Sequence, residues 1–382
     1  MFHLTRNRRW LFSACVLLCL AASALGLDPS KSLSQYAHDR WDSTRGFLGG
    51  TVYAICQSAD GYLWIGTERG LVRFDGFHFT LLPRPIPNEP ALGPVRGLVS
   101  DEEGNLWIRL DGSRLLRYLN GRFEDASVQF DLSDIRFTAM SADSAGGVLM
   151  SGLGSRTLRY HAGTIEKIAD SREMEGTIIS LSRTRDQRVW IGTRDYGLFL
   201  MDQGRAVHIS KNFANQKINA LMPAKDGGIW VGTDNGIKYL DSSGNLVRRV
   251  PASFDDFQIF SIILDRDANL WAGTDHGLLR IDRNGGVSVA PWNRAANREV
   301  TAVYEDRDGD LWIGDSQGIE RMRDGTFTTY STADGLPAKD NGPIYADSDG
   351  RTWFAPASGG LYWLKDGHVS HVPNAEIGRA HV

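Results

Sequence analysis

The sequence contains few cysteines, no strong excess of either charge, and almost no long apolar run. Three cysteines in 382 residues exclude a disulfide-rich scaffold. The 42 basic and 46 acidic residues nearly balance, which argues against a nucleic acid partner. Beyond the N-terminus, no apolar run reaches the ~18 residues that a membrane-spanning helix needs. With 42% hydrophobic residues, the chain is expected to fold around a substantial core.

Motifs of enzymes and cofactor sites are also missing from the sequence. No phosphate-binding loop or dinucleotide fingerprint occurs, and Pro356 replaces the first glycine of the one approximate nucleophile elbow. His368 and His371 fall in a predicted strand, where this spacing points them to opposite faces. The acidic segments 306–310 and 347–350 lack the glycine position and the closing glutamate of a calcium loop and are predicted to be turns. We therefore assign no catalytic residue and expect no metal and no cofactor.

Residues 1–26 predict an export signal. Three arginines precede an apolar stretch at residues 10–20, and small residues offer a cleavage site close to residue 24 or 26. An uncleaved membrane anchor is the alternative interpretation. Two of the three cysteines lie in this segment, so the exported part keeps only Cys56.

One sequence pattern recurs eight times after this segment. Asp60–Thr67 illustrates it: a turn, an apolar residue, a tryptophan, a second apolar residue and a glycine. Successive copies are 40 to 43 residues apart, and Met150 replaces the tryptophan in one of them. We expect these aromatic rings to fill the wedge between neighbouring sheets and to be structural. The repeated tryptophans are Trp64, Trp107, Trp190, Trp230, Trp271, Trp312 and Trp353.

Each repeat predicts four short strands. In the first repeat these are Val52–Gln57, Tyr62–Thr67, Leu71–Asp75 and His78–Leu82, separated by turns rich in glycine and aspartate. Helical periodicity is absent. Four strands in each repeat of about 41 residues predict an all-β fold, a β-propeller of four-stranded blades. A solenoid built only of strands would have a shorter period.

The ends of the repeat region suggest how the ring closes. Residues 35–41 resemble the last strand of a repeat, so we expect an N-terminal strand to complete the final blade. This predicts a seven-bladed propeller over residues 27–331, with the start of a second propeller at residues 332–373. One eight-bladed ring is the alternative. Residues 374–382 follow no repeat rule, and the last seven match the translation of a sequencing-library adapter, which suggests a truncated sequence with a non-native tail; an ordinary disordered tail is the alternative.

The repeats resemble those of the two-component regulator propeller family. Asp60–Gly76 matches the family pattern D-G-x-L-W-I-G-T-x-x-G-L-x-R-F-D-G nearly throughout, and the resemblance covers residues 28–373. It extends to the opening Leu27, Asp28 and Pro29, followed by Gln35, Tyr36, His38 and Trp41. The resemblance implies the exported, periplasmic or extracytoplasmic, sensor half of an inner-membrane receptor in signal transduction. Its output domain would be missing from this chain: a sensor or hybrid histidine kinase acting in a phosphorelay is preferred, and a diguanylate cyclase is the alternative.

The loops between the second and third strands vary in charge and shape while the framework stays constant. In propellers such loops surround the central channel, where ligands usually bind. We therefore predict a site for a small polar or oligosaccharide-like ligand there, although each loop could also be a plain solvated turn. The predicted ligand-binding residues are Arg69, Arg194, Asp195, Tyr196, Asp234, Asn235, Asp275, His276, Asp315 and Gln317.

Two other functions stay open at this point. A secreted propeller enzyme, a lyase or a hydrolase, would use Asp275 and His276 as a general acid–base pair. A protein-interaction platform without a small ligand would show a flat apolar face. Dimerisation is expected only for a full-length receptor, through the downstream signalling domains.

Overall fold

The computed structural model describes residues 26–154, 156–170, 174, 176–202, 205–209, 213–290, 298–336, 342–357 and 359–373. The predicted export signal, except Gly26, and the predicted tail at residues 374–382 lie outside these ranges. Within the described ranges, none of the helices is both long and apolar enough to span a membrane.

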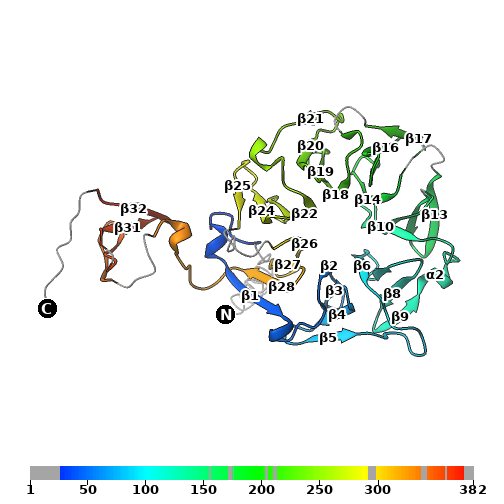
Figure 1. Cartoon of the computed structure of the whole chain (residues 1–382), viewed down its shortest axis with the longest axis horizontal. Coiled ribbons are helices and arrows are strands. Elements are labelled where there is room, and N and C mark those ends of the chain that lie inside the picture. The colour runs from blue at the N-terminus through cyan, green and yellow to red at the C-terminus, as the bar shows by residue number, and fades with distance from the viewer. Residues whose placement is uncertain are drawn as a thin grey trace, which may run out of the picture.

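The described residues form eight four-stranded antiparallel sheets, which confirms the predicted all-β propeller fold (Figure 1). The first four sheets contain β2 (Val52–Gln57), β3 (Leu63–Thr67), β4 (Gly70–Phe74), β5 (Phe79–Leu82); β6 (Val95–Ser100), β7 (Leu106–Leu110), β8 (Leu115–Leu119), β9 (Arg122–Asp125); β10 (Phe137–Ala142), β11 (Val148–Gly152), β12 (Arg156–His161), β13 (Thr164–Asp170); and β14 (Ile178–Arg183), β15 (Val189–Thr193), β16 (Leu198–Asp202), β17 (Arg205–His208).

The other four sheets follow the same order along the chain, apart from β1, which joins the seventh. They contain β18 (Ile218–Pro223), β19 (Ile229–Thr233), β20 (Gly236–Leu240), β21 (Leu246–Val247); β22 (Ile259–Leu264), β23 (Leu270–Thr274), β24 (Gly277–Ile281), β25 (Val287–Val289); β26 (Val300–Glu305), β27 (Leu311–Asp315), β28 (Gly318–Arg323), β1 (Ala37–Asp42); and β29 (Ile344–Ala346), β30 (Thr352–Phe354), β31 (Tyr362–Lys365), β32 (His368–His371). The short helices are η1 (Leu33–Gln35), η2 (Ser43–Arg45), α2 (Ala126–Gln129), η3 (Ala252–Phe254) and η4 (Thr332–Asp334).

Seven sheets surround a central opening, each with its first strand innermost (Figure 1). The strands β2, β6, β10, β14, β18, β22 and β26 contact one another in this order, and β26 contacts β2. The predicted N-terminal strand closes this ring: β1 pairs antiparallel with β28, from Ala37 opposite Arg323 to Asp42 opposite Gly318. The first and last described parts of the ring therefore share one sheet.

The repeated tryptophans pack between sheets, where the sequence placed them. Trp64 and Trp107 are fully buried, and the indole of Trp107 donates to Asp101, six residues earlier, at 2.8 Å. A glycine follows two residues after most of these tryptophans because the neighbouring sheet lies against it: a Cβ on Gly66 would come within 2.8 Å of the Val95 carbonyl oxygen. Sheet packing thus depends on the large ring and the absent side chain together.

The acidic segments that resemble calcium loops are turns, as predicted. One carboxylate oxygen of Asp306 accepts hydrogen bonds from the backbone nitrogens of Asp308 and Asp310, both at 3.0 Å. The other accepts from the indole of Trp312 at 2.7 Å. Asp347 binds Trp353 in the same way. The repeated aspartate therefore fixes the turn between the first two strands and holds the tryptophan ring.

The eighth sheet, β29 to β32, lies beside the ring rather than within it (Figure 1). Ser32 and Ser34, near the N-terminus of the ring, donate hydrogen bonds to Asp334, which precedes this sheet. The predicted domain boundary between residues 331 and 332 stays a prediction.

Candidate functional site

A pocket of about 450 Å³ opens on the face of the ring that carries the loops between second and third strands. Three adjacent sheets form it, through the starts of β6, β10 and β14 and the loops that follow β7, β11 and β15. Four of its lining side chains are arginines: Arg96, Arg109, Arg136 and Arg194. Asp111 is the carboxylate among the lining residues.

Arg109 lies in this pocket because the second sheet reverses a rule of the repeat. In five other ring sheets a glycine of the second strand stands opposite an alanine or serine of the first. In the second sheet, Arg109 takes the place of that glycine and Gly97 stands opposite it. A Cβ on Gly97 would lie 3.1 Å from Nε of Arg109. In the second sheet the glycine thus lies on the first strand instead of the second. Because Gly97 has no side chain, the guanidinium group of Arg109 has room beside it.

Backbone oxygens and neighbouring charges hold the buried guanidinium. Arg109 donates to the carbonyl oxygens of Arg96 and Phe137 at 3.0 and 3.4 Å, while its Nε is buried and unpaired among the described residues. Burial lowers the pKa of Arg109 to about 10, although the Asp111 carboxylate favours its charged form. The group still carries its charge at neutral pH. A bound anion would stabilise that charge further.

The remaining charges make the pocket electropositive. Nε of Arg96 lies 3.1 Å from Asp111, and its guanidinium lies 4.1 Å from the centre of the Tyr53 ring. Arg136 and Arg194 are exposed, and in the described part of the chain neither forms an ion pair. The lining thus contains four guanidinium groups and one carboxylate. Since guanidinium groups bind carboxylate, sulfate and phosphate oxygens in pairs, the arrangement suits a ligand that carries an anionic group.

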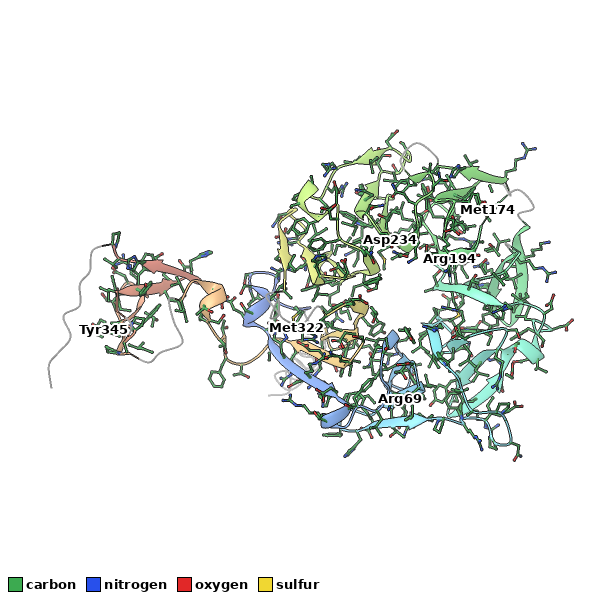
Figure 2. All side chains as sticks on the ribbon, viewed as in Figure 1. Arg69, Met174, Arg194, Asp234, Met322 and Tyr345 are labelled. Carbon is green, nitrogen blue, oxygen red and sulfur yellow. The ribbon has the colours of Figure 1, made fainter. Side chains whose placement is uncertain are left out.

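One of the ten predicted ligand-binding residues, Arg194, lines this pocket. Arg194 and Asp234 lie near the central opening of the ring (Figure 2). Asp234 accepts a hydrogen bond from Asn219 of β18 at 2.7 Å. Nδ1 of His276 lies 2.8 Å from Oδ1 of Asp275, and the His276 ring stacks on Phe257.

Asp315 has a structural environment that the sequence did not indicate. Its side chain is 1% exposed and pairs with Arg40 of β1 at 2.8 Å and with Arg298 at 2.6 Å. Burial by itself would raise the pKa of Asp315, but the two guanidinium groups hold it below its usual value. The carboxylate of Asp315, at the end of β27, therefore binds β1 within the seventh sheet and has no exposed surface for a ligand.

The other predicted residues occupy exposed turns. Arg69 donates to the carbonyl oxygen of Leu48 at 3.4 Å, and Tyr196 is 40% exposed with its carbonyl oxygen accepting from His208. The backbone nitrogens of Asn235 and Gln317 donate within their own turns, and Asp195 is exposed. Arg194 is the one of the ten that lines the arginine pocket, and a shared ligand site for the other nine stays a prediction.

Sequence reasoning missed Arg96, Arg109 and Arg136, although a signal for one of them was present. Arg109 breaks the repeat at a position where glycine is the rule. Arg96 lies at the start of β6, and Arg136 directly precedes β10. Both are at first strands, whereas the predicted site residues came from the loops between second and third strands.

Comparison with known proteins agrees with this architecture. The model of the two-component regulator propeller matches residues 46–69, 212–235 and 295–317, segments that lie around β2–β3, β18–β19 and β26–β27. The ring is thus a β-propeller that carries repeats of the two-component regulator propeller, as the sequence resemblance predicted. No curated protein matches the chain.

Solved structures with similar folds include extracellular domains of two hybrid two-component systems from B. thetaiotaomicron. One has a TM-score of 0.72 at 19% identity, covering 89% of this chain and 49% of that one. The other has a TM-score of 0.62 at 21% identity, covering 89% and 47%. The chain therefore spans about half the length of these domains. Virginiamycin B lyase from Staphylococcus aureus has a TM-score of 0.58 at 15% identity, covering 76% of this chain and 99% of that one.

Proposed function

We propose that this propeller is the ligand-sensing part of an extracytoplasmic receptor. The arginine-lined pocket carries the proposal, because four arginines and a single carboxylate line it. The ligand is a small polar molecule, such as an oligosaccharide, that bears a carboxylate, sulfate or phosphate group. The nearly balanced charge of the whole chain does not oppose this, since a pocket attracts anions through its local field.

The proposal includes an output domain in the remainder of a longer protein. The repeats of the two-component regulator propeller and the likeness to extracellular domains of hybrid two-component systems support it. A histidine kinase is the preferred output and a diguanylate cyclase the alternative. The receptor would dimerise through parts outside this chain, and an export signal would place the propeller in the periplasm or outside the cell.

Calorimetric titration with paired oligosaccharides tests the pocket. Neutral oligosaccharides and their uronate-containing counterparts of equal length are titrated into the purified chain. We expect the acidic member of a pair to bind, and Arg136→Ala combined with Arg194→Ala to weaken it at least about tenfold, or about 1.4 kcal/mol. Both side chains are exposed, so their loss should spare the fold.

Arg122→Ala is the matched control, since Arg122 is an exposed residue of an outermost strand. It should leave the affinity unchanged. Equal binding of neutral and acidic members, or equal binding by the double variant, would refute the arginine pocket. Turnover of a bound oligosaccharide that is lost in His276→Ala would favour the enzyme instead, since Asp275 and His276 are within hydrogen-bonding distance.

A further inference from the structure

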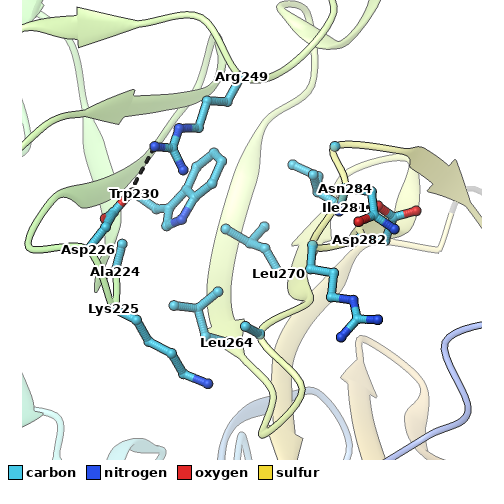
Figure 3. Close-up of a pocket in the computed structure, with 13 residues that line it drawn as sticks. Ala224, Lys225, Asp226, Trp230, Arg249, Leu264, Leu270, Ile281, Asp282 and Asn284 are labelled. Carbon is cyan, nitrogen blue, oxygen red and sulfur yellow. Dashed lines mark hydrogen bonds and ion pairs between the residues drawn. The ribbon is translucent and has the colours of Figure 1, made fainter.

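A second cavity of about 450 Å³ lies between the fifth and sixth sheets, at the opposite ends of the strands from the arginine pocket. The turns between first and second strands, and between third and fourth strands, form its rim. Trp230, Leu264, Leu270 and Ile281 provide an apolar floor, and Lys225 and Asp282 are part of its polar rim (Figure 3).

Trp230 has lost the hydrogen-bond acceptor that the repeat normally provides. Five other repeated tryptophans donate their indole N–H to a side chain six residues earlier: Ser58, Asp101, Asp265, Asp306 or Asp347. Position 224 is alanine, and no described residue accepts from Trp230. The Trp230 side chain is only 6% exposed, and the nitrogen edge of its ring faces the cavity (Figure 3). The indole nitrogen of Trp190 also lacks an acceptor among the described residues, but it is buried, whereas that of Trp230 is not. The N–H of Trp230 is therefore accessible from the cavity and can donate to an acceptor on a ligand.

A change in the sixth sheet leaves the space beside Trp230 open. Tyr118 packs 4.8 Å from Trp64 of the preceding sheet and donates to Asp60 at 2.7 Å. Tyr160 covers Trp107 in the same manner. The strand register places Ile281 at the corresponding position over Trp230. Isoleucine is smaller than tyrosine and has no hydroxyl group, so the gap between these two sheets stays unfilled.

In the first sheet, the turn carboxylate of Asp60 binds the tyrosine of the next sheet. The corresponding carboxylate of the fifth sheet, Asp226, has other partners. Asp226 accepts from Tyr239 of its own sheet at 2.5 Å and from Arg249 at 2.9 Å. Asp282 accepts from the backbone nitrogens of Asn284 and Gly286 within its turn. Within the described residues, Lys225 and Arg283 therefore lack a carboxylate partner, which gives the rim an excess of positive charge.

We infer that this cavity binds a small aromatic carboxylate. The apolar floor would hold the ring, the indole N–H of Trp230 would donate to an acceptor on the ligand, and Lys225 and Arg283 would attract the carboxylate. A volume of about 450 Å³ falls in the range of small-molecule sites. This site is separate from the arginine pocket and does not depend on the receptor function proposed above.

Titration calorimetry with benzoate and indole-3-acetate, and with the neutral molecules benzyl alcohol and indole, tests the inference. We expect a carboxylate to bind saturably and more tightly than its neutral counterpart. Ala224→Asp should restore the acceptor that Asp101 gives Trp107, and Ile281→Tyr should fill the gap. Each should weaken binding at least about tenfold, which is about 1.4 kcal/mol, while the chain stays folded.

Ala59→Asp is the matched control, because Ala59 is exposed in the corresponding turn of the first sheet. It should bind like the unchanged chain. The double variant Arg136→Ala with Arg194→Ala should also keep this affinity, so the two sites can fail separately. Absence of saturable binding by either carboxylate, or undiminished binding by Ala224→Asp and Ile281→Tyr, would overturn the inference.

Discussion

The second and eighth sheets share one sequence pattern but differ in burial. Trp107 and Trp353 both donate their indole N–H to an aspartate six residues earlier, at 2.8 and 2.6 Å. Trp107 is fully buried between sheets, whereas Trp353 is only partly covered. Ile344 of β29 is 74% exposed, while Val95 of β6 is fully buried. The repeat therefore encodes a sheet and its turns, and neighbouring sheets on both sides convert that sheet into part of a core.

The largest expected effect comes from removing the ring tryptophan in each setting. Trp107→Ala should lower the free energy of unfolding of the ring by about 3–5 kcal/mol, because it leaves a cavity between two sheets. Trp353→Ala should change the same transition by less than about 0.5 kcal/mol. Denaturation followed by circular dichroism gives both values. Equal losses would mean that the eighth sheet is packed as tightly as the ring.

The second prediction concerns closure of the ring, a feature that the eighth sheet lacks. Asp315→Ala should lower the free energy of unfolding by about 2–3 kcal/mol, because Arg40 and Arg298 would lose one of the two buried carboxylates, Asp315 and Glu320, that they share. The control is Asp134→Ala, which removes an exposed partner of Arg156 and should cost less than about 1 kcal/mol. A comparable small loss for Asp315→Ala would show that β1 is held by its backbone pairing alone.

The sequence predicted the local structure of the ring well. The first strand of the first sheet spans Val52–Gln57 as expected, and β1 pairs with β28. Both depend on strand patterning and turn chemistry, which act over a few residues and recur at a fixed period. The tryptophan, placed between sheets by its size, follows from the same repeat.

The two cavities could not be derived from the repeat, because each depends on contacts between different sheets. Arg96, Arg109, Arg136 and Arg194 come from three sheets and meet only when the ring forms. Ala224 and Ile281 likewise come from two different sheets, and they line one cavity only because these sheets pack together. What the sequence did contain is the position of each exception: arginine in place of glycine at 109 and alanine in place of aspartate at 224. Both proposed cavities thus contain a departure from the repeat, and the ligand site predicted at the variable loops stays a prediction.

The smallest effect that we predict depends on pH and sharpens the contrast between buried and exposed turns. Asn105 and Asn269 donate to the turn aspartates Asp101 and Asp265 at 2.8 and 2.9 Å. The seventh sheet has Asp310 at that position, and burial together with the neighbouring Asp306 raises the pKa of Asp310 to about 6. The eighth sheet has Arg351 there, with a side chain that is 38% exposed. Ionisation of a side chain at this position is therefore expected to lower stability in the seventh sheet, through Asp310, and not in the eighth.

The sign follows from the two pKa values of Asp310. An unfolded aspartate loses its proton near pH 4, but the folded one keeps it to about pH 6, so the free energy of unfolding falls as the pH rises between these values. Asp310→Asn should therefore stabilise the ring by about 1–2 kcal/mol at pH 7.5, and this gain should shrink toward pH 4. Urea denaturation at both pH values measures it, with the exposed Asp308→Asn as control. A gain that is the same at both pH values would mean that the new amide hydrogen bond, rather than the removed charge, stabilises the turn.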